Sequence, residues 1–179
     1  MKTTQILIAG FGGQGILFSG KFLAYKGLME DIQVSWLPSY GPEMRGGTAN
    51  CNVILSDDPV GSPIITSPDV LIAMNLPSLQ KYVDSVVSGG QIYVDSSLID
   101  AKVERDDVEV FYIPATQMAK DEGIGTLANM IIVGHFLENN PNMSFDGVDR
   151  VVEKLVPPTK AALKELNMKA LTLGKNYNA

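Results

Sequence analysis

Short apolar segments alternate along this chain with longer segments whose apolar residues recur every three or four positions. Segments of the first kind have the length and residue types of strands, and they lie at residues 5–9, 33–37, 50–55, 69–74, 91–95 and 109–113. Segments of the second kind predict helices, and they lie at residues 14–29, 78–87, 126–137, 144–155, 160–166 and 168–175. Strands that alternate with helices favour a mostly parallel sheet with helices on both faces.

This order of elements predicts the fold class. We expect an α/β protein, built as a single three-layer α/β/α Rossmann-like domain with a mostly parallel sheet and a C-terminal helical pair. The length of 179 residues suits one domain over residues 1–179. Pro157 and Pro158 interrupt the pattern, so residues 157–179 are expected to form a C-terminal helical extension of that domain. Ser144 and Asp146 are candidate caps for the helix that ends at Leu155.

Composition narrows the classes of function. The net charge of −6 argues against a general nucleic-acid binder and against a protein that binds anionic membranes, because both would show a basic face. No apolar run reaches the roughly 18 residues that a membrane-spanning helix needs. The first residues lead directly into a strand-like run without the features of a signal peptide. We therefore expect no nucleic-acid or membrane partner and a cytoplasmic location.

The residues that carry redox, metal or acid–base chemistry are few. Cys51 is the one cysteine, which excludes an internal disulfide and an iron–sulfur cluster held by this chain alone. We predict that Cys51 is a buried small residue, with a reactive thiol as the alternative. His135 is the one histidine and lies on an apolar helix face, so we predict a packed residue rather than a base. We predict no catalytic residue and no metal ligand on this chain.

The first glycine-rich loop joins the first predicted strand to the first predicted helix. Gly10, Gly12 and Gly15 match the G-x-G-x-x-G pattern, which permits a tight turn and a close approach of the backbone to a phosphate. The start of the helix adds free N–H groups and a partial positive charge. Gly13 and Gln14 favour contact with a ligand or partner, because a loop that serves packing requires neither.

Three interpretations of this loop remain open. A NAD site requires an acidic residue near the end of the second strand, and that strand ends in Trp36-Leu37-Pro38-Ser39. A dinucleotide site is therefore disfavoured. The loop is otherwise a tight turn that serves packing, or it contacts a phosphate or the backbone of a partner, which is the interpretation that we favour.

A second loop, residues 39–47, follows the second strand and is expected to emerge at the carboxyl edge of the sheet beside the first loop. Arg45 is suited to pair with a phosphate or carboxylate, and Glu43 is suited to orient Arg45 or to meet a cation of a partner. The alternative is a surface turn with a local ion pair. Asn75 follows another strand and is a candidate for capping or for lining the same cleft. The candidate binding residues of this loop are Ser39, Tyr40, Gly41, Glu43, Arg45, Gly46 and Gly47.

The two loops also carry a resemblance to a known family. The segments GFGGQG at residues 10–15 and SYGPEMRGG at residues 39–47, at this spacing, resemble the gamma subunit of 2-oxoacid:ferredoxin oxidoreductases. The resemblance covers the whole chain, through shorter motifs whose positions are Asn75, Pro114-Ala115, Ala128-Asn129-Met130 with Gly134, and Asn167 to Ala170 with Gly174.

This resemblance implies an activity and a set of partners. Enzymes of the family oxidatively decarboxylate a 2-oxoacid to an acyl-CoA and pass the electrons to ferredoxin. They use thiamine diphosphate, Mg²⁺, [4Fe-4S] clusters and coenzyme A, of which none is expected to be held by this chain alone. The implied partners are the alpha and beta subunits, with a delta (ferredoxin-like) subunit as a further candidate. A homo-oligomer is conceivable when the chain is made alone.

The resemblance also suggests a role for the loops, in which residues 12–15 and Arg45 contact a phosphate of coenzyme A or a partner subunit. Two other classes of function remain open. One is a stand-alone Rossmann-type nucleotide-binding oxidoreductase. The other is a purely structural assembly subunit whose loops contact protein.

Overall fold

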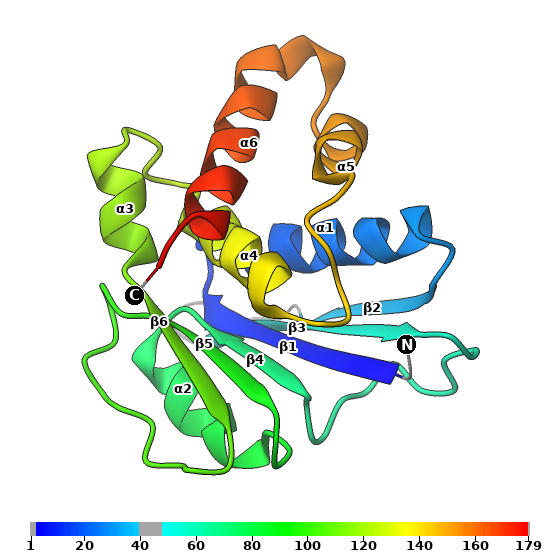
Figure 1. Cartoon of the computed structure of the whole chain (residues 1–179), viewed down its shortest axis with the longest axis vertical. Coiled ribbons are helices and arrows are strands. Elements are labelled where there is room, and N and C mark those ends of the chain that lie inside the picture. The colour runs from blue at the N-terminus through cyan, green and yellow to red at the C-terminus, as the bar shows by residue number, and fades with distance from the viewer. Residues whose placement is uncertain (1–2, 40–47, 179) are drawn as a thin grey trace.

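The computed structural model describes residues 3–39 and 48–178, which contain a six-stranded mixed sheet (Figure 1). The order of the strands across the sheet is β2-β3-β1-β4-β5-β6. Five of them run in one direction, because β3 is antiparallel to both of its neighbours and the other neighbouring pairs are parallel. The strands are β1 (Thr3–Phe11), β2 (Gln33–Ser39), β3 (Thr48–Ser56), β4 (Val70–Ala73), β5 (Gln91–Asp95) and β6 (Glu109–Ile113).

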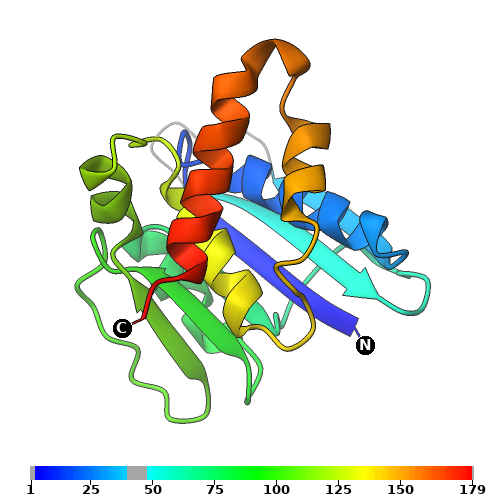
Figure 2. The same cartoon turned by 45° about the horizontal axis from the view of Figure 1, so that its top comes forward.

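Helices cover both faces of this sheet. Figures 1 and 2 show α1 and α4 across one face, α5 and α6 stacked outside them, and α2 on the opposite face. The helices are α1 (Ile16–Met29), α2 (Leu76–Tyr82), α3 (Ala115–Asp121), α4 (Ala128–Asn139), α5 (Val148–Leu155) and α6 (Ala161–Lys175), with 3-10 turns η2 (Val83–Ser85) and η3 (Pro158–Lys160). The predicted α/β class with a mostly parallel sheet is confirmed.

Alternation along the central strands divides the apolar residues between two cores. Ile6 and Ile8 of β1 point toward α1 and α4, whereas Leu7 between them points toward α2. Successive side chains of a strand lie on opposite faces, so a strand that is apolar throughout must be covered on both sides. The core beside α2 is the smaller of the two. Ala170 and Leu171 of α6 belong to the larger core, so the C-terminal helix is packed into the domain.

The predicted pair of C-terminal helices is wrong, because the chain forms one continuous helix over residues 161–175. Asn167 suggested a break, but its side chain is buried within the helix and donates from Nδ2 to the carbonyl oxygen of Leu163. The predicted caps Ser144 and Asp146 are also wrong. Gly147, in a left-handed conformation, precedes α5 and provides no side-chain cap. Helix α3 was not predicted.

The α4–α6 contact explains two glycines of the C-terminal motifs. A Cβ atom on Gly134 would overlap the carbonyl oxygen of Leu171 in α6, and a Cβ atom on Gly174 would overlap the carbonyl oxygen of Ile131 in α4. The two helices therefore touch backbone to backbone, which other residue types would prevent. His135 lies at the same crossing, where Nδ1–H donates to the carbonyl oxygen of Gly174 at 3.1 Å.

His135 is the packed helix residue that the sequence predicted. It is buried and surrounded by the rings of Tyr93, Phe111 and Tyr177. Burial lowers its pKa below the ordinary value, although the bond to Gly174 and the nearby Glu138 act in the opposite direction. The neutral ring is therefore favoured in the folded chain.

We expect the protonation of His135 to destabilise the fold at acidic pH. An unfolded chain takes up this proton near pH 6.5, whereas the folded chain takes it up at lower pH. The contribution of the neutral ring to the free energy of unfolding is complete above about pH 7 and is lost as the pH falls below 6.5. Urea unfolding should show that the free energy of unfolding falls more between pH 7.5 and pH 5.5 for the natural chain than for His135→Gln. Equal losses would contradict this prediction, since no second histidine exists to mask it.

Candidate functional site

The predicted binding residues that the structure describes gather at one edge of the sheet. Strands β1, β2 and β4 end there, and β3 begins there, because Phe11 pairs with Thr48 and Ser39 pairs with Asn50. Ser39 and Thr48, the described residues on either side of residues 40–47, thus lie at the same edge of the sheet as the first loop. Tyr40, Gly41, Glu43, Arg45, Gly46 and Gly47 lie outside the described residues.

Two glycines of the first loop have a left-handed backbone, of which Gly15 belongs to the G-x-G-x-x-G pattern and Gly13 does not. Gly13 and Gly15 have φ angles of 90° and 76°, in the left-handed region that side chains disfavour. Gly15 is the N-terminal cap of α1, and its carbonyl oxygen accepts the first helical hydrogen bond, from Ser19 N at 3.0 Å. The N–H groups of residues 16–18 consequently have no acceptor within the helix and point toward the loop.

Gln14 has a structural task that the sequence did not reveal. Its Oε1 accepts from Phe11 N at 2.6 Å, and its Nε2 donates to the carbonyl oxygen of Met74 at 2.9 Å. The side chain therefore spans the gap between the ends of β1 and β4. These bonds use both ends of the carboxamide, so the polar side chain of Gln14 does not by itself favour contact with a ligand.

Gln14 lies in the crevice of the sheet where a dinucleotide would be expected to bind. Helix α1 follows β1 onto one face of the sheet and α2 follows β4 onto the other, so the chain diverges between these neighbouring strands (Figure 1). In open α/β sheets ligands bind in the crevice at such a point. Here Gln14 bridges the crevice, and Gly10 leaves room for it, since a Cβ at Gly10 would lie 2.6 Å from Oε1.

Asn75 caps the helix on the second side of this crevice. Its Oδ1 accepts from Ser78 N at 2.8 Å, while Nδ2 is buried and has no hydrogen-bond partner among the described residues. The structure thus shows the capping role that the sequence offered as one alternative. Within the described part of the chain, the hydroxyl of Ser78 is likewise buried and unpaired.

A hollow of about 300 Å³ lies on the α1 side of the glycine loop. Its described lining is backbone and apolar side chains, including Phe11, which is 42% exposed. This volume is at the lower end of the range for small-molecule sites. The described part of the hollow therefore offers amide and apolar groups but no charged side chain. Its lining residues are Phe11, Gly12, Gly13, Gly15, Ile16, Leu17, Phe18 and Ala49.

Other polar residues at this edge are used in packing. Asp95 ends β5 with its side chain fully buried, and it accepts hydrogen bonds from Ser97 N, Thr116 N and Thr116 Oγ1. Cys51 is fully buried in β3, and burial raises the pKa of its thiol to about 12, so the predicted buried small residue is confirmed. Such a thiol fits neither a nucleophile nor a cluster ligand.

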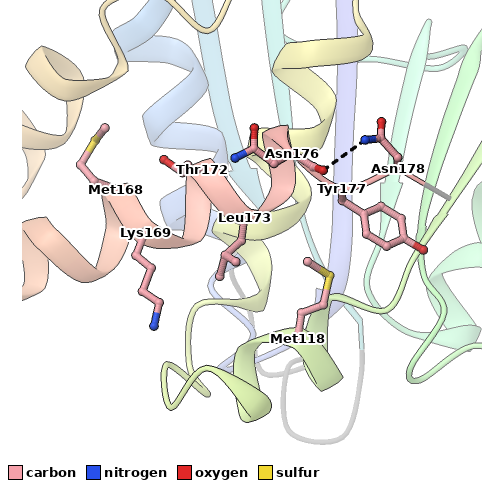
Figure 3. Close-up of a pocket in the computed structure, with 8 residues that line it drawn as sticks. All are labelled: Met118, Met168, Lys169, Thr172, Leu173, Asn176, Tyr177 and Asn178. Atoms are coloured by element: carbon pink, nitrogen blue, oxygen red, sulfur yellow. Dashed lines mark hydrogen bonds between the residues drawn. The ribbon is translucent and has the colours of Figure 1, made fainter.

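A second cavity, of about 670 Å³, lies away from the predicted site, between α3 and α6 (Figure 3). Figure 3 shows Met118 of α3 pointing toward Leu173 and Tyr177. Lys169 at its border is paired with Glu122 at 2.7 Å. None of the predicted site residues lines this cavity. Across the described residues, no group of three or more His, Cys, Asp or Glu side chains is placed to hold a metal ion.

Comparison with known proteins places this architecture in a family. The family model for pyruvate ferredoxin/flavodoxin oxidoreductases matches residues 5–177. The chain belongs to this family. The resemblance inferred from the two glycine-rich loops is thereby confirmed. Within residues 3–39 and 48–178, no helix has the length and apolar character needed to cross a membrane.

Curated relatives in this family differ in length. The chain is 34% identical to the ketoisovalerate oxidoreductase subunit VorA of Methanothermobacter marburgensis over 98% of its own residues, but it spans 37% of that relative. It is 33% identical to the 2-oxoglutarate synthase subunit KorC of the same organism, covering 96% of this chain and 94% of that subunit.

Solved structures likewise include a chain of similar length and a longer chain that this protein matches in part. The gamma subunit of a keto/oxoacid ferredoxin oxidoreductase from Geobacter sulfurreducens superposes with a TM-score of 0.81 at 29% identity, covering 96% of this chain and 95% of that one. A 2-oxoglutarate:ferredoxin oxidoreductase from Magnetococcus marinus, solved with 2-oxoglutarate, coenzyme A and succinyl-CoA bound, gives a TM-score of 0.86 at 25% identity. The match covers 98% of this chain and 31% of that one.

Proposed function

We propose that this chain is the gamma-type subunit of a 2-oxoacid:ferredoxin oxidoreductase. The complex would convert a 2-oxoacid and coenzyme A into an acyl-CoA and CO₂ and pass two electrons to ferredoxin. The observation that carries the proposal is the incomplete site: a hollow of about 300 Å³ at a glycine-rich helix start, without a charged side chain in its described lining. The nearly full-length match to KorC and to a solved gamma subunit supports the same assignment.

The contribution of this chain would be docking and binding rather than catalysis. The N–H groups at the start of α1 favour a phosphate or another anion, and the exposed ring of Phe11 favours contact with a partner. On this proposal, Gly12, Gly13 and Gly15 approach a phosphate of coenzyme A or the alpha subunit, and Arg45 adds the cation that the described lining lacks. Gln14 and Asn75 would hold the two sides of the edge in position.

The cofactors would belong to the partner chains. Thiamine diphosphate with Mg²⁺ would activate the 2-oxoacid there, and [4Fe-4S] clusters would carry the electrons. The described residues of this chain do not fit these groups, because Cys51 is buried as a thiol and no carboxylate cluster is placed for a metal. Alpha and beta subunits, with a delta (ferredoxin-like) subunit as a further candidate, are the proposed partners, in the cytoplasm.

The test is anaerobic purification of the complex through a tag on this chain, followed by viologen reduction with each of four acids. These are pyruvate, 2-oxoglutarate, 2-oxoisovalerate and indolepyruvate. We expect reduction that requires one acid and coenzyme A and yields the matching acyl-CoA, whereas the isolated chain should be inactive. Activity of the isolated chain with NAD(P)H would instead establish a stand-alone oxidoreductase. An Arg45→Ala complex with unchanged assembly and unchanged KM for coenzyme A would remove the proposed role of that arginine.

A further inference from the structure

Asn129 connects α4 to the glycine-rich loop from the inside of the protein. It is the second residue of α4 and is 3% exposed. Its Nδ2 donates to the carbonyl oxygen of Gly15 at 3.1 Å and to Ser19 Oγ at 3.0 Å. One side chain therefore holds both the cap and the first turn of α1, although Asn129 lies 114 positions from Gly15 in the sequence.

The orientation of this carboxamide follows from its partners. A backbone carbonyl can only accept, so the atom that faces the oxygen of Gly15 must be the NH₂ group. Oδ1 then faces elsewhere and is buried, and no group of residues 3–39 and 48–178 bonds to it. An unpaired buried oxygen destabilises the folded state, and a leucine of similar size would avoid that cost. The two donated bonds are thus the feature that packing alone does not explain.

The fit between Asn129 and the loop is also steric. A Cβ atom on Gly15 would lie 2.5 Å from Nδ2 and 2.7 Å from Cγ of Asn129. The absence of a side chain at Gly15 therefore makes room for the carboxamide of Asn129. Because the oxygen of Gly15 also accepts from Ser19 N, Asn129 sets the direction of the whole first turn and of its free N–H groups.

We propose that Asn129 is a positioning residue for coenzyme A in the assembled enzyme. This inference rests on the proposed function. Asn129 would not contact the ligand, because it bonds to Gly15, which lines the hollow, but does not line the hollow itself. It would instead fix the free N–H groups of residues 16–18 in the direction that a phosphate requires. A preorganised set of donors binds an anion more tightly than one that must first become ordered.

Asn167 provides a matched control. It is also a buried asparagine of a helix, 2% exposed, and its Oδ1 likewise has no partner in the part of the chain that the structure describes. Its Nδ2 donates to Leu163 O within its own helix, and it does not line the hollow of the glycine loop. Replacing either asparagine by leucine removes a buried carboxamide, so a difference between the two variants reports on the loop.

The experiment compares Asn129→Leu and Asn167→Leu in the purified complex. We expect Asn129→Leu to raise the KM for coenzyme A about tenfold, equivalent to about 1.4 kcal/mol. The KM for the 2-oxoacid should stay within about twofold. Asn167→Leu should leave both KM values unchanged. Hydrogen exchange of the peptide that covers residues 11–19 should become faster in Asn129→Leu but not in Asn167→Leu.

Ser19→Ala, which removes one of the two acceptors of Asn129, keeps the test decisive if Asn129→Leu fails to assemble. It should raise the KM for coenzyme A by a smaller factor. An unchanged KM in an assembled variant, or an equal change for Asn129 and Asn167, would overturn the positioning role. A natural complex without coenzyme A-dependent turnover would instead refute the proposed function, so the two failures are distinguishable.

Discussion

Gly174→Ala is expected to lower the free energy of unfolding by about 2–3 kcal/mol, although alanine is the better helix former. The added Cβ atom would overlap the carbonyl of Ile131 and approach the backbone nitrogen of His135. Backbone atoms cannot rotate away as a flexible side chain can, so α6 would have to move away from α4. That movement would also weaken the packing of Leu171 and the bond from His135 to Gly174.

Thermal unfolding followed by circular dichroism measures this effect, and a fall in Tm of roughly 5–10 °C is expected for a chain of this size. Gly125→Ala is the control, because no atom lies within 4 Å of its added Cβ and its backbone is not left-handed. Its Tm should change little. If Gly174→Ala were as stable as the natural chain, the backbone contact between α4 and α6 would be refuted.

Asp95→Ala should destabilise the chain by about 3 kcal/mol, because it removes three hydrogen bonds to one fully buried carboxylate. Two of these bonds come from Thr116 in the first turn of α3, so the substitution should also loosen that helix. Asp95→Asn retains an acceptor and should have an intermediate effect. Urea unfolding provides the free energies for comparison.

Asp100→Ala serves as the control for Asp95, since Asp100 is a nearby but exposed aspartate. It should change the unfolding free energy by no more than about 0.5 kcal/mol. An Asp95→Ala chain of natural stability would show that the carboxylate does not support α3. The prediction thus distinguishes a structural role of Asp95 from direct contact with a ligand.

Several polar residues at the carboxyl edge of the sheet form hydrogen bonds within the protein rather than remaining free for a ligand. Gln14 and Asn75 were candidates for ligand contact because each is polar and follows a strand, and Asp95 is a further polar residue at the end of β5. Each instead has bonds within the protein that brace the loop, α2 or α3. The groups left for a ligand or partner are the backbone of residues 12–18, the ring of Phe11 and the second loop.

Much of the fold was predictable because its signals are local. Apolar runs and helical spacing located the six strands and most helices, and the boundaries of β5 and β6 agree with the structure. Helix α3 was missed because it is short and its start is supported by Asp95, which lies 21 positions earlier. The reversal of β3 was not predicted either. Its cause is a connection too short for the crossover that parallel strands require.

The sequence by itself determined most of the elements, the place of the glycine-rich turn and the family, since these depend on residue types within short segments. The tertiary structure decided what the polar residues do. Gln14 meets Met74 across 60 positions and Asn129 meets Gly15 across 114, and no periodicity encodes such pairs. The glycine at residue 15 and the asparagine at residue 129 therefore have one shared physical reason, because they are the two halves of a single contact.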